Sequence, residues 1–214
     1  MKNIEEILLQ KNKPKEALYK AVKHDFRLLP HVIEGMNSPK AAIRYGCGKV
    51  LMELSEEYPE KMYPYFDTIV PFLKSKYRII IWQVLFIIAQ LTKVDTKKQF
   101  DKIFETYYSF LHDEYMVTVA NLVGYSGTIA VAKPYLIPKI TDQLLKVESL
   151  LTTPHLTEEC KRVIAEKAID SFDMFFDTIE KKDHVLAFVQ KQTKSPRRSL
   201  QKRARIFLEK RKKF

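Results

Sequence analysis

The sequence predicts an all-α protein, a right-handed α-solenoid of about five stacked helical hairpins. Apolar residues recur at helical spacing along most of the 214-residue chain, and no strand-like alternation of useful length appears. The chain has ten prolines, many of them at helix starts, and only five glycines, too few for the tight turns of a hairpin-rich β protein. One apolar stripe also returns in the same phase on several helices.

Helical periodicity and helix stops place twelve helices along the chain. They span residues 2–10, 14–24, 26–36, 39–56, 59–74, 76–93, 96–111, 114–131, 134–148, 157–179, 181–192 and 196–212. Proline suits the first turn of a helix because its missing N–H has no partner there. Ser38-Pro39 and Ser195-Pro196 therefore predict an N-cap serine followed by the first helical residue.

An internal repeat appears when three helices are aligned at the serines that precede them, Ser38, Ser75 and Ser195. Apolar residues stand five, nine, twelve and thirteen positions after each serine: Ile43, Cys47, Val50, Leu51; Ile80, Val84, Ile87, Ile88; and Leu200, Ala204, Phe207, Leu208. Further copies begin near His112-Asp113 and near Thr157, with spacings of about 37, 37, 45 and 38 residues, a range typical of two-helix repeats. A single hairpin cannot bury its apolar face alone, so we expect the copies to stack.

We expect one domain over residues 1–214, with capping helices at 1–25, central repeats over 26–190 and a basic C-terminal helix in 191–214. The most apolar stretch, Ile79–Leu91, has 13 residues, fewer than the roughly 18 that a membrane span needs. It therefore predicts a buried central helix. The N-terminus lacks the long apolar run of a secretory signal. The two cysteines, Cys47 and Cys160, stand far apart in apolar-periodic segments, which predicts buried thiols and fits a cytoplasmic protein.

The segment Leu28–Leu54 resembles a HEAT repeat. The shared features are an early proline, a polar turn, an aliphatic–arginine pair and small residues in the second helix: Pro30, Asn37-Ser38-Pro39, Ile43-Arg44, and Gly46, Cys47 and Gly48. Residues 60–91 are also similar, although Ile81 stands where Arg44 stands in the first copy. The resemblance to the HEAT-repeat (HEAT/armadillo-like) family implies a fold and no particular function, because such folds carry many kinds of site.

The net charge of +11 is concentrated at one end of the chain. Residues 191–214 hold 11 Lys and Arg against a single acid, Glu209, whereas the other 190 residues sum to +1. The apolar stripe would dock this last helix onto the preceding repeat and turn its bases toward solvent. The candidate anion-binding residues are Arg197, Arg198, Lys202 and Arg205, with Lys212 and Lys213 further along. Clustered bases attract phosphates and acidic surfaces, so an anionic partner is predicted. The alternative is a solvated capping helix.

A second group of candidates lies on the helices that would line the concave face of a HEAT-like stack. Tyr45 and Trp82 occupy the position seven residues after the aligned serines. The bases flanking them are Lys40, Arg44, Lys76 and Arg78. Together these side chains could stack nucleic-acid bases and hold a phosphate backbone. The alternative, which is the more common role of large aromatics, is packing between repeats.

No catalytic or metal-binding pattern is apparent in the sequence. The histidines lie far apart without metal-ligand spacing: His24, His31, His112, His155 and His184. His112-Asp113-Glu114 predicts a polar turn, and Ser126 lacks the G-x-S-x-G pattern of a nucleophile elbow. We therefore expect no cofactor, no metal and no catalytic residue.

The chain is also similar in length, charge and helical repeat to the HEAT-like DNA alkylation-repair glycosylases. That resemblance implies release of alkylated bases with the help of one carboxylate, for which Asp113 and Asp173 are available mid-chain, although neither lies in a matching motif. We expect instead a non-enzymatic scaffold that engages an anionic partner, most of all nucleic acid, through its basic helix and concave face. The remaining alternative is a protein–protein adaptor that grips a peptide or helix in the concave groove.

Overall fold

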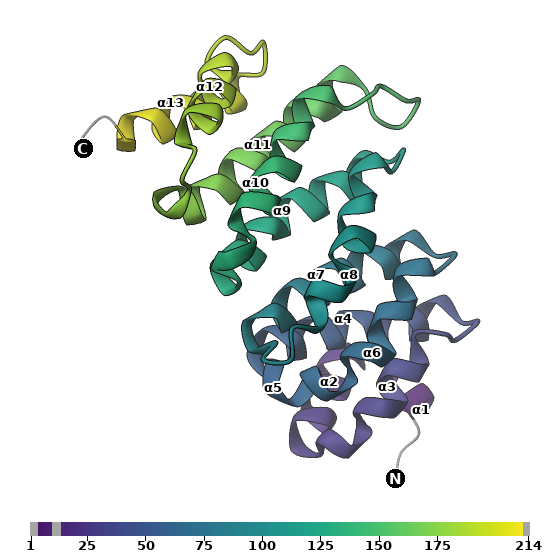
Figure 1. Ribbon diagram of the computed structural model, residues 1–214. Helices are drawn as coiled ribbons and strands as arrows, with labels where there is room; N and C mark the ends of the chain where they lie inside the picture. Colours follow the sequence, from purple (N-terminus) through teal and green to yellow (C-terminus); the bar gives the residue numbers. More distant parts are fainter. Residues whose placement is uncertain (1–3, 10–13, 212–214) are drawn as a thin grey trace. The chain divides into compact units, whose positions relative to one another are not determined.

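The computed structural model in Figure 1 describes residues 4–9 and 14–211. Apart from one isolated bridge between Thr153 and Leu156, the regular structure of these residues is helical. This confirms the all-α class predicted from the sequence. Within the described ranges, no helix combines the length and the apolar content needed to cross a membrane.

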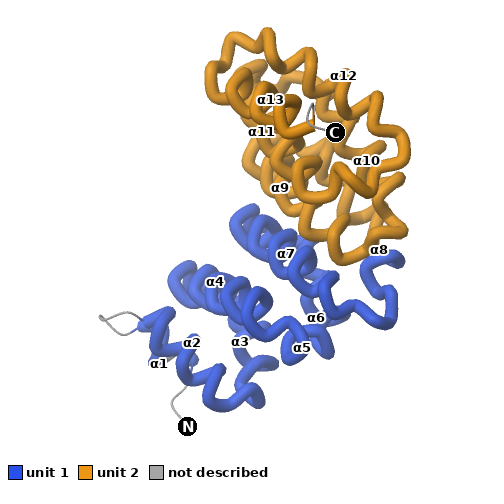
Figure 2. The backbone as a smooth tube through the Cα atoms, turned by 90° about the vertical axis from the view of Figure 1, so that its left-hand side faces the viewer, with its two compact units in different colours: residues 1–102 blue, residues 103–214 orange. Residues whose placement is uncertain are grey.

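The chain divides into two compact units, Met1–Lys102 and Ile103–Phe214, which are blue and orange in Figure 2. The division falls inside α8 (Gln99–Tyr108). Both units bury apolar side chains of their own. The single domain predicted over residues 1–214 stays a prediction.

Unit 1 contains helical hairpins. In each of them a first arm with 3-10 turns precedes a long second helix. Its elements are α1 (Ile4–Leu8), α2 (Pro14–His24), η1 (Phe26–Leu28), α3 (Leu29–Gly35), α4 (Ala41–Glu57), α5 (Pro59–Met62), η2 (Tyr63–Tyr65), α6 (Phe66–Ile69), η3 (Val70–Lys74), α7 (Arg78–Leu91), η4 (Thr92–Val94) and the start of α8. The second helices α4 and α7 pack side by side. Helix α2 lies against the other side of α4.

Unit 2 repeats this arrangement three times. After the end of α8 its elements are η5 (Ser109–His112), α9 (Met116–Ala132), η6 (Pro134–Leu136), α10 (Ile137–Leu145), η7 (Lys146–Ser149), α11 (Glu158–Phe175), η8 (Phe176–Thr178), α12 (Lys182–Gln192) and α13 (Arg198–Arg211). Helix α11 packs between α9 and α13, so these three second helices form one layer (Figure 1). Besides the pair α1 and α2, the described residues thus contain five hairpins, whose second helices are α4, α7, α9, α11 and α13.

Prolines break the first arms more than the sequence predicted. The helix expected over 59–74 is divided into short α and 3-10 segments, with Pro64 and Pro71 at the starts of the 3-10 segments. The helix expected over 134–148 is divided in the same way next to Pro138. Each proline lacks the N–H that would continue an α-helical ladder, so the arm tightens or bends at that point.

Four second helices are preceded by the same kind of local turn. Ser38 and Ser195, predicted as N-caps, belong to two of these turns and lie before the helix caps. A side-chain oxygen accepts the N–H of the residue two positions later, and the helix starts one residue further on. The four bonds are Lys40 N to Ser38 Oγ at 3.2 Å, Tyr77 N to Ser75 Oγ at 3.2 Å, Tyr115 N to Asp113 Oδ1 at 2.8 Å and Arg197 N to Ser195 Oγ at 3.3 Å. The proline of the two Ser-Pro pairs therefore lies before the helix, because the side chain closes a local turn.

The apolar stripe of the repeat forms the core of each hairpin. Of the twelve residues at the aligned offsets, eleven are buried, and Leu208 is half-buried. The turn at Asp113 sets the register of the third copy along the chain, which places Thr118, Leu122 and Ser126 on the buried side of α9. Ten of the fourteen residues of α7 are buried, although Ile79, predicted as part of the buried spine, is 40% exposed.

Small residues on α4 allow three neighbours to approach closely. A Cβ added to Gly46 would lie 3.0 Å from Leu8 Cδ2 on α1, and one added to Gly48 would overlap with the Gln83 amide on α7. Between them, Cys47 lies against Gly35 at the end of α3. These contacts explain the run of small residues that resembles a HEAT repeat.

Candidate binding surfaces

Helix α13 joins unit 2 through its apolar stripe. Leu200, Ala204 and Phe207 are buried, and the helix packs against both α11 and α12. The ring of Phe207 lies edge-on to Phe176, with 5.2 Å between the ring centroids. The bases of α13 are therefore distributed over the two flanks and the outer side of the helix.

One flank of α13 is neutralised by the carboxylates of α11. Salt bridges form a ladder between the two helices, and we call it the ion-pair ladder: Arg197 with Glu159 and Glu166, Arg203 with Asp170, and Lys210 and Arg211 with Asp173. The four acids recur every three to seven residues and so share one side of α11. Much of the basic charge predicted to face a partner is thus balanced within unit 2.

The ladder lowers the pKa values of two of its carboxylates, Glu159 and Asp173. Hydrogen bonds from Arg197 and Arg162 hold the pKa of Glu159 below its ordinary value. Burial raises the pKa of Asp173, but hydrogen bonds from Lys210 and Arg211 outweigh burial, and the net shift is downward. Both carboxylates are therefore ionised at neutral pH.

Three further bases face solvent and make no ion pair among the described residues. We call Arg198, Lys202 and Arg205 the exposed basic face. They are four and three residues apart, so they lie on neighbouring turns of α13. Arg197, the fourth base predicted for this surface, belongs instead to the ion-pair ladder. Lys212 and Lys213 lie outside the described residues.

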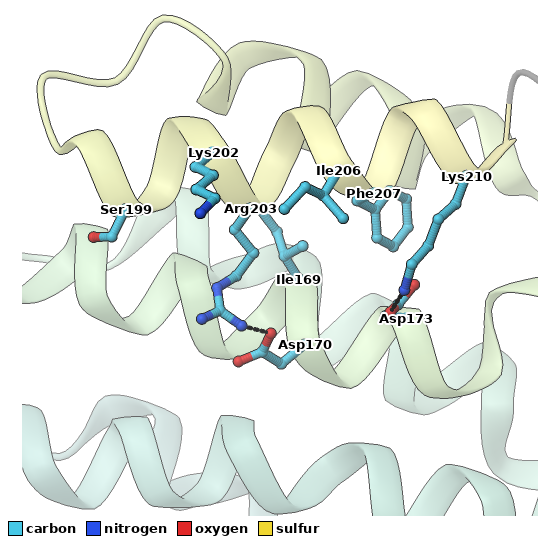
Figure 3. A pocket seen from close by; sticks show the side chains of 9 residues that line it. All are labelled: Ile169, Asp170, Asp173, Ser199, Lys202, Arg203, Ile206, Phe207 and Lys210. Atoms are coloured by element: carbon cyan, nitrogen blue, oxygen red, sulfur yellow. Dashed lines mark hydrogen bonds and ion pairs between the residues drawn. The ribbon is translucent and has the colours of Figure 1, made fainter.

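A groove of about 370 Å³ runs between α11 and α13. Figure 3 shows the side chains that line this α11–α13 groove: Ile169, Asp170, Asp173, Ser199, Lys202, Arg203, Ile206, Phe207 and Lys210. Its apolar floor contains the buried side chains of Ile169 and Phe207. The groove shares Lys202 with the exposed basic face.

In unit 1, Arg44 is a buried residue with 4% of its surface exposed. Its guanidinium lies between two rings, 3.5 Å from the centroid of Tyr77 and 4.6 Å from that of Tyr45. Nη1 donates to the carbonyl oxygens of Ser38 at 2.6 Å and Pro39 at 3.1 Å. These contacts hold the turn that precedes α4, so the guanidinium is engaged within the fold.

The other predicted residues of unit 1 are more accessible. Lys40 is exposed at the N-cap of α4. Lys76 is exposed, with its Nζ 5.2 Å from the centroid of Tyr77. Arg78 begins α7, Trp82 lies one turn further on, and both are half-buried. The binding and stacking roles of these residues stay predictions.

Two features of these surfaces escaped the sequence analysis. The first is the ring of Tyr77, which contacts Arg44, Tyr45 and Lys76. Tyr77 lies outside the apolar stripe of the repeat, so the stripe did not predict its role. The second is the ion-pair ladder, whose acids on α11 meet the bases of the last helical segment. The common helical spacing of these acids and of the bases that they meet is the signal that would have found the ladder.

The two carboxylates considered for base release have structural partners. Asp113 accepts the N–H of Tyr115 at the start of α9, and Asp173 accepts from Lys210 and Arg211. Within the described ranges, no group of three or more His, Cys, Asp or Glu side chains is placed to hold a metal ion.

No protein-family model matches the sequence, and a search of curated proteins finds no match. A designed armadillo repeat protein aligns with a TM-score of 0.60 at 17% identity, over 96% of this chain and 97% of that chain. Another, in complex with the peptide (KR)4, aligns with a TM-score of 0.61 at 15% identity, over 96% and 89%. Computationally designed armadillo repeat proteins for modular peptide recognition align with a TM-score of 0.57 at 18% identity, over 96% and 89%. The chain therefore has the all-α repeat fold of HEAT/armadillo-like proteins, as its sequence predicts.

Proposed function

We propose that this chain is a non-enzymatic binding scaffold that engages an anionic partner through the exposed basic face of α13. The observation that carries the proposal is the division of the bases on this helix. Those of the ion-pair ladder are balanced by α11, whereas Arg198, Lys202 and Arg205 face solvent without a carboxylate among the described residues. Unpaired bases on neighbouring turns of one helix attract an anionic polymer.

Nucleic acid and an acidic protein segment are the two partners that this surface can take. Nucleic acid is the partner predicted from the charge of the C-terminal segment, although the ion-pair ladder reduces the charge available for phosphates. A peptide partner is supported by the likeness in fold to a designed armadillo repeat protein in complex with the peptide (KR)4. Because this chain carries a net charge of +11, its own peptide partner would be acidic rather than basic.

The test measures binding of fluorescent duplex DNA, single-stranded RNA and poly-glutamate by anisotropy over a salt series. Contacts to phosphates release counterions, so affinity for duplex DNA should fall steeply as salt rises. Replacing Arg198, Lys202 and Arg205 together by Gln should reduce the slope of log affinity against log salt by about three, roughly one for each lost contact. The same variant should weaken poly-glutamate binding at low salt.

The matched control removes the same charge elsewhere in unit 2. Lys139, Lys146 and Lys181 are exposed bases outside α13, and their joint replacement by Gln should leave the slope close to that of the parent protein. Equal weakening by both triple variants would mean that binding reflects net charge and not the exposed basic face. Absence of binding to all three probes at low salt would refute the proposal.

A further inference from the structure

Neighbouring second helices pack against each other through different kinds of contact, and we call each such contact region a seam. Between α4 and α7, Gly48 lets the Gln83 amide sit directly against the helix backbone. Between α9 and α11, Ser171 Oγ donates to the Val123 carbonyl at 2.6 Å, and Gly127 faces the Ser171 backbone. The seam between α11 and α13 is instead bridged by long charged side chains. The α11–α13 groove lies along this seam.

The α11–α13 groove offers three kinds of contact within a short distance. Ile206 is 43% exposed and offers an apolar contact at the edge of the groove. One turn before it, Lys202 has no ion pair among the described residues. Figure 3 shows both side chains extending from α13 toward α11, with Asp170 and Asp173 on the opposite wall. An apolar contact, a cation without an ion pair in the described ranges and two carboxylates held by the ion-pair ladder thus line one surface.

We propose that this groove docks a segment of a partner protein in which an apolar side chain stands next to a carboxylate. The apolar side chain would cover Ile206, and the carboxylate would pair with Lys202. The inference rests on the proposed function and narrows the anionic partner to an acidic protein segment. Helix α13 has 14 residues and spans roughly 21 Å, which about seven extended residues would match.

The exposed side chain of Ile206 favours a peptide over nucleic acid. A row of phosphates laid along the groove could pair with Lys202 but would offer Ile206 no apolar contact. A peptide can place an apolar side chain over Ile206 next to a carboxylate that pairs with Lys202. The existing bridge from Arg203 to Asp170 is no obstacle, because both side chains are about 40% exposed (43% and 39%), and exposed ion pairs exchange partners at little cost.

The experiment uses the whole protein and two fluorescent peptides of about ten residues, long enough to cover α13 when extended. Both consist of glutamate, glycine and serine around one central position, which is leucine in the first peptide and serine in the second. Ile206→Ser should weaken binding of the leucine peptide about fivefold, the loss expected when a partly buried apolar contact is removed. The same variant should leave the serine peptide unchanged. Lys202→Gln should weaken both.

The matched control is Ile79→Ser, at an isoleucine of similar exposure (40%) on α7 in unit 1. It should bind both peptides like the parent protein, and circular dichroism should show unchanged helicity for both serine variants. Suppose that the triple variant of the exposed basic face weakens peptide binding while Ile206→Ser does not. This result would contradict docking in the α11–α13 groove and would still support the proposed function. If the RNA binds and neither peptide does, the acidic-peptide inference is refuted. If no anionic probe binds, both fail.

Discussion

Gly35 at the end of α3 and Cys47 on α4 lie in direct contact, with no room for a side chain between them. A Cβ added to Gly35 would overlap with Cys47 Sγ and lie 3.4 Å from Cys47 Cβ. Cys47 is fully buried, so its short side chain has nowhere to move. Gly35→Ala should therefore destabilise the protein by about 1 to 3 kcal/mol, the usual cost of overpacking, as measured by urea denaturation.

Two further variants separate this clash from other effects. In a double-mutant cycle, Cys47→Ala should recover part of the loss caused by Gly35→Ala, because the two residues share one contact. Gly124→Ala is the control: the added Cβ would meet only Lys167 Cδ at 3.6 Å, in the middle of α9. It should stabilise the protein by about 0.5 to 1 kcal/mol through helix propensity. Equal effects of the two alanine variants would contradict the contact.

The two thiols should differ in reactivity. Burial raises the pKa of Cys47 to about 12, so its thiol is protonated at neutral pH as well as covered. Cys160 is only half-buried near the start of α11. Because the thiolate is the reactive form, a thiol reagent at pH 7 should label Cys160 at least tenfold faster, as followed by mass spectrometry. Labelling of Cys47 should become fast only in denaturant, and equal rates in the native protein would show that Cys47 is not enclosed.

Removal of one carboxylate of the ion-pair ladder should have a pH-dependent cost. The pKa of Asp173 is lower in the folded protein than its ordinary value, so its stabilising effect is present above the unfolded pKa and is lost as pH falls through the folded pKa. Asp173→Asn should lower the free energy of unfolding by about 0.5 kcal/mol at pH 7, a modest value because the ion pairs of Asp173 are partly exposed. The difference from the parent protein should shrink below roughly pH 4.

Asp177→Asn is the matched control for this measurement. Asp177 is an exposed acid in η8 that makes no ion pair among the described residues. Its replacement should change the free energy of unfolding by less than about 0.5 kcal/mol at any pH. If the effect of Asp173→Asn were independent of pH, the cause would be lost packing and not the salt bridges to Lys210 and Arg211.

Replacement of Arg44 tests whether this base stabilises the fold or binds a partner. Lysine cannot reproduce the planar contact with Tyr77 and Tyr45 or both hydrogen bonds to the turn before α4. Arg44→Lys should therefore lower the free energy of unfolding by about 2 kcal/mol, whereas Lys74→Gln, at an exposed base of the same unit, should change it little. Unchanged stability together with weaker anion binding would instead support the binding role predicted from the sequence.

The hairpins could be predicted closely because their signals are local. The spacing of apolar residues after Ser38, Ser75 and Ser195 depends only on the pitch of a helix, and eleven of the twelve residues at those offsets are buried in the structure. The broken first arms were harder to predict. Pro64 and Pro71 are compatible with both a kinked helix and a series of short turns, and packing against the second helix decides between them.

The candidate surfaces were predicted less well, because charge counts do not say which bases find partners. Arg44 looks like any other base in the sequence, yet the turn before α4 and the ring of Tyr77 enclose it. Arg197 and Arg198 are adjacent in the sequence and differ in role: the first is bound by Glu159 and Glu166, and the second faces solvent.

By itself, the sequence determined that the chain is all helical, that its hairpins repeat and that basic residues collect in the last helix. Those properties follow from local spacing and composition. Only the tertiary structure decided which of these bases remain available. Neighbouring second helices bring together residues more than thirty positions apart, such as Arg203 and Asp170, so the acids of one repeat neutralise the bases of the next. The solvent-facing charge is what remains after that pairing, and it is the part of the basic helix on which a partner can act.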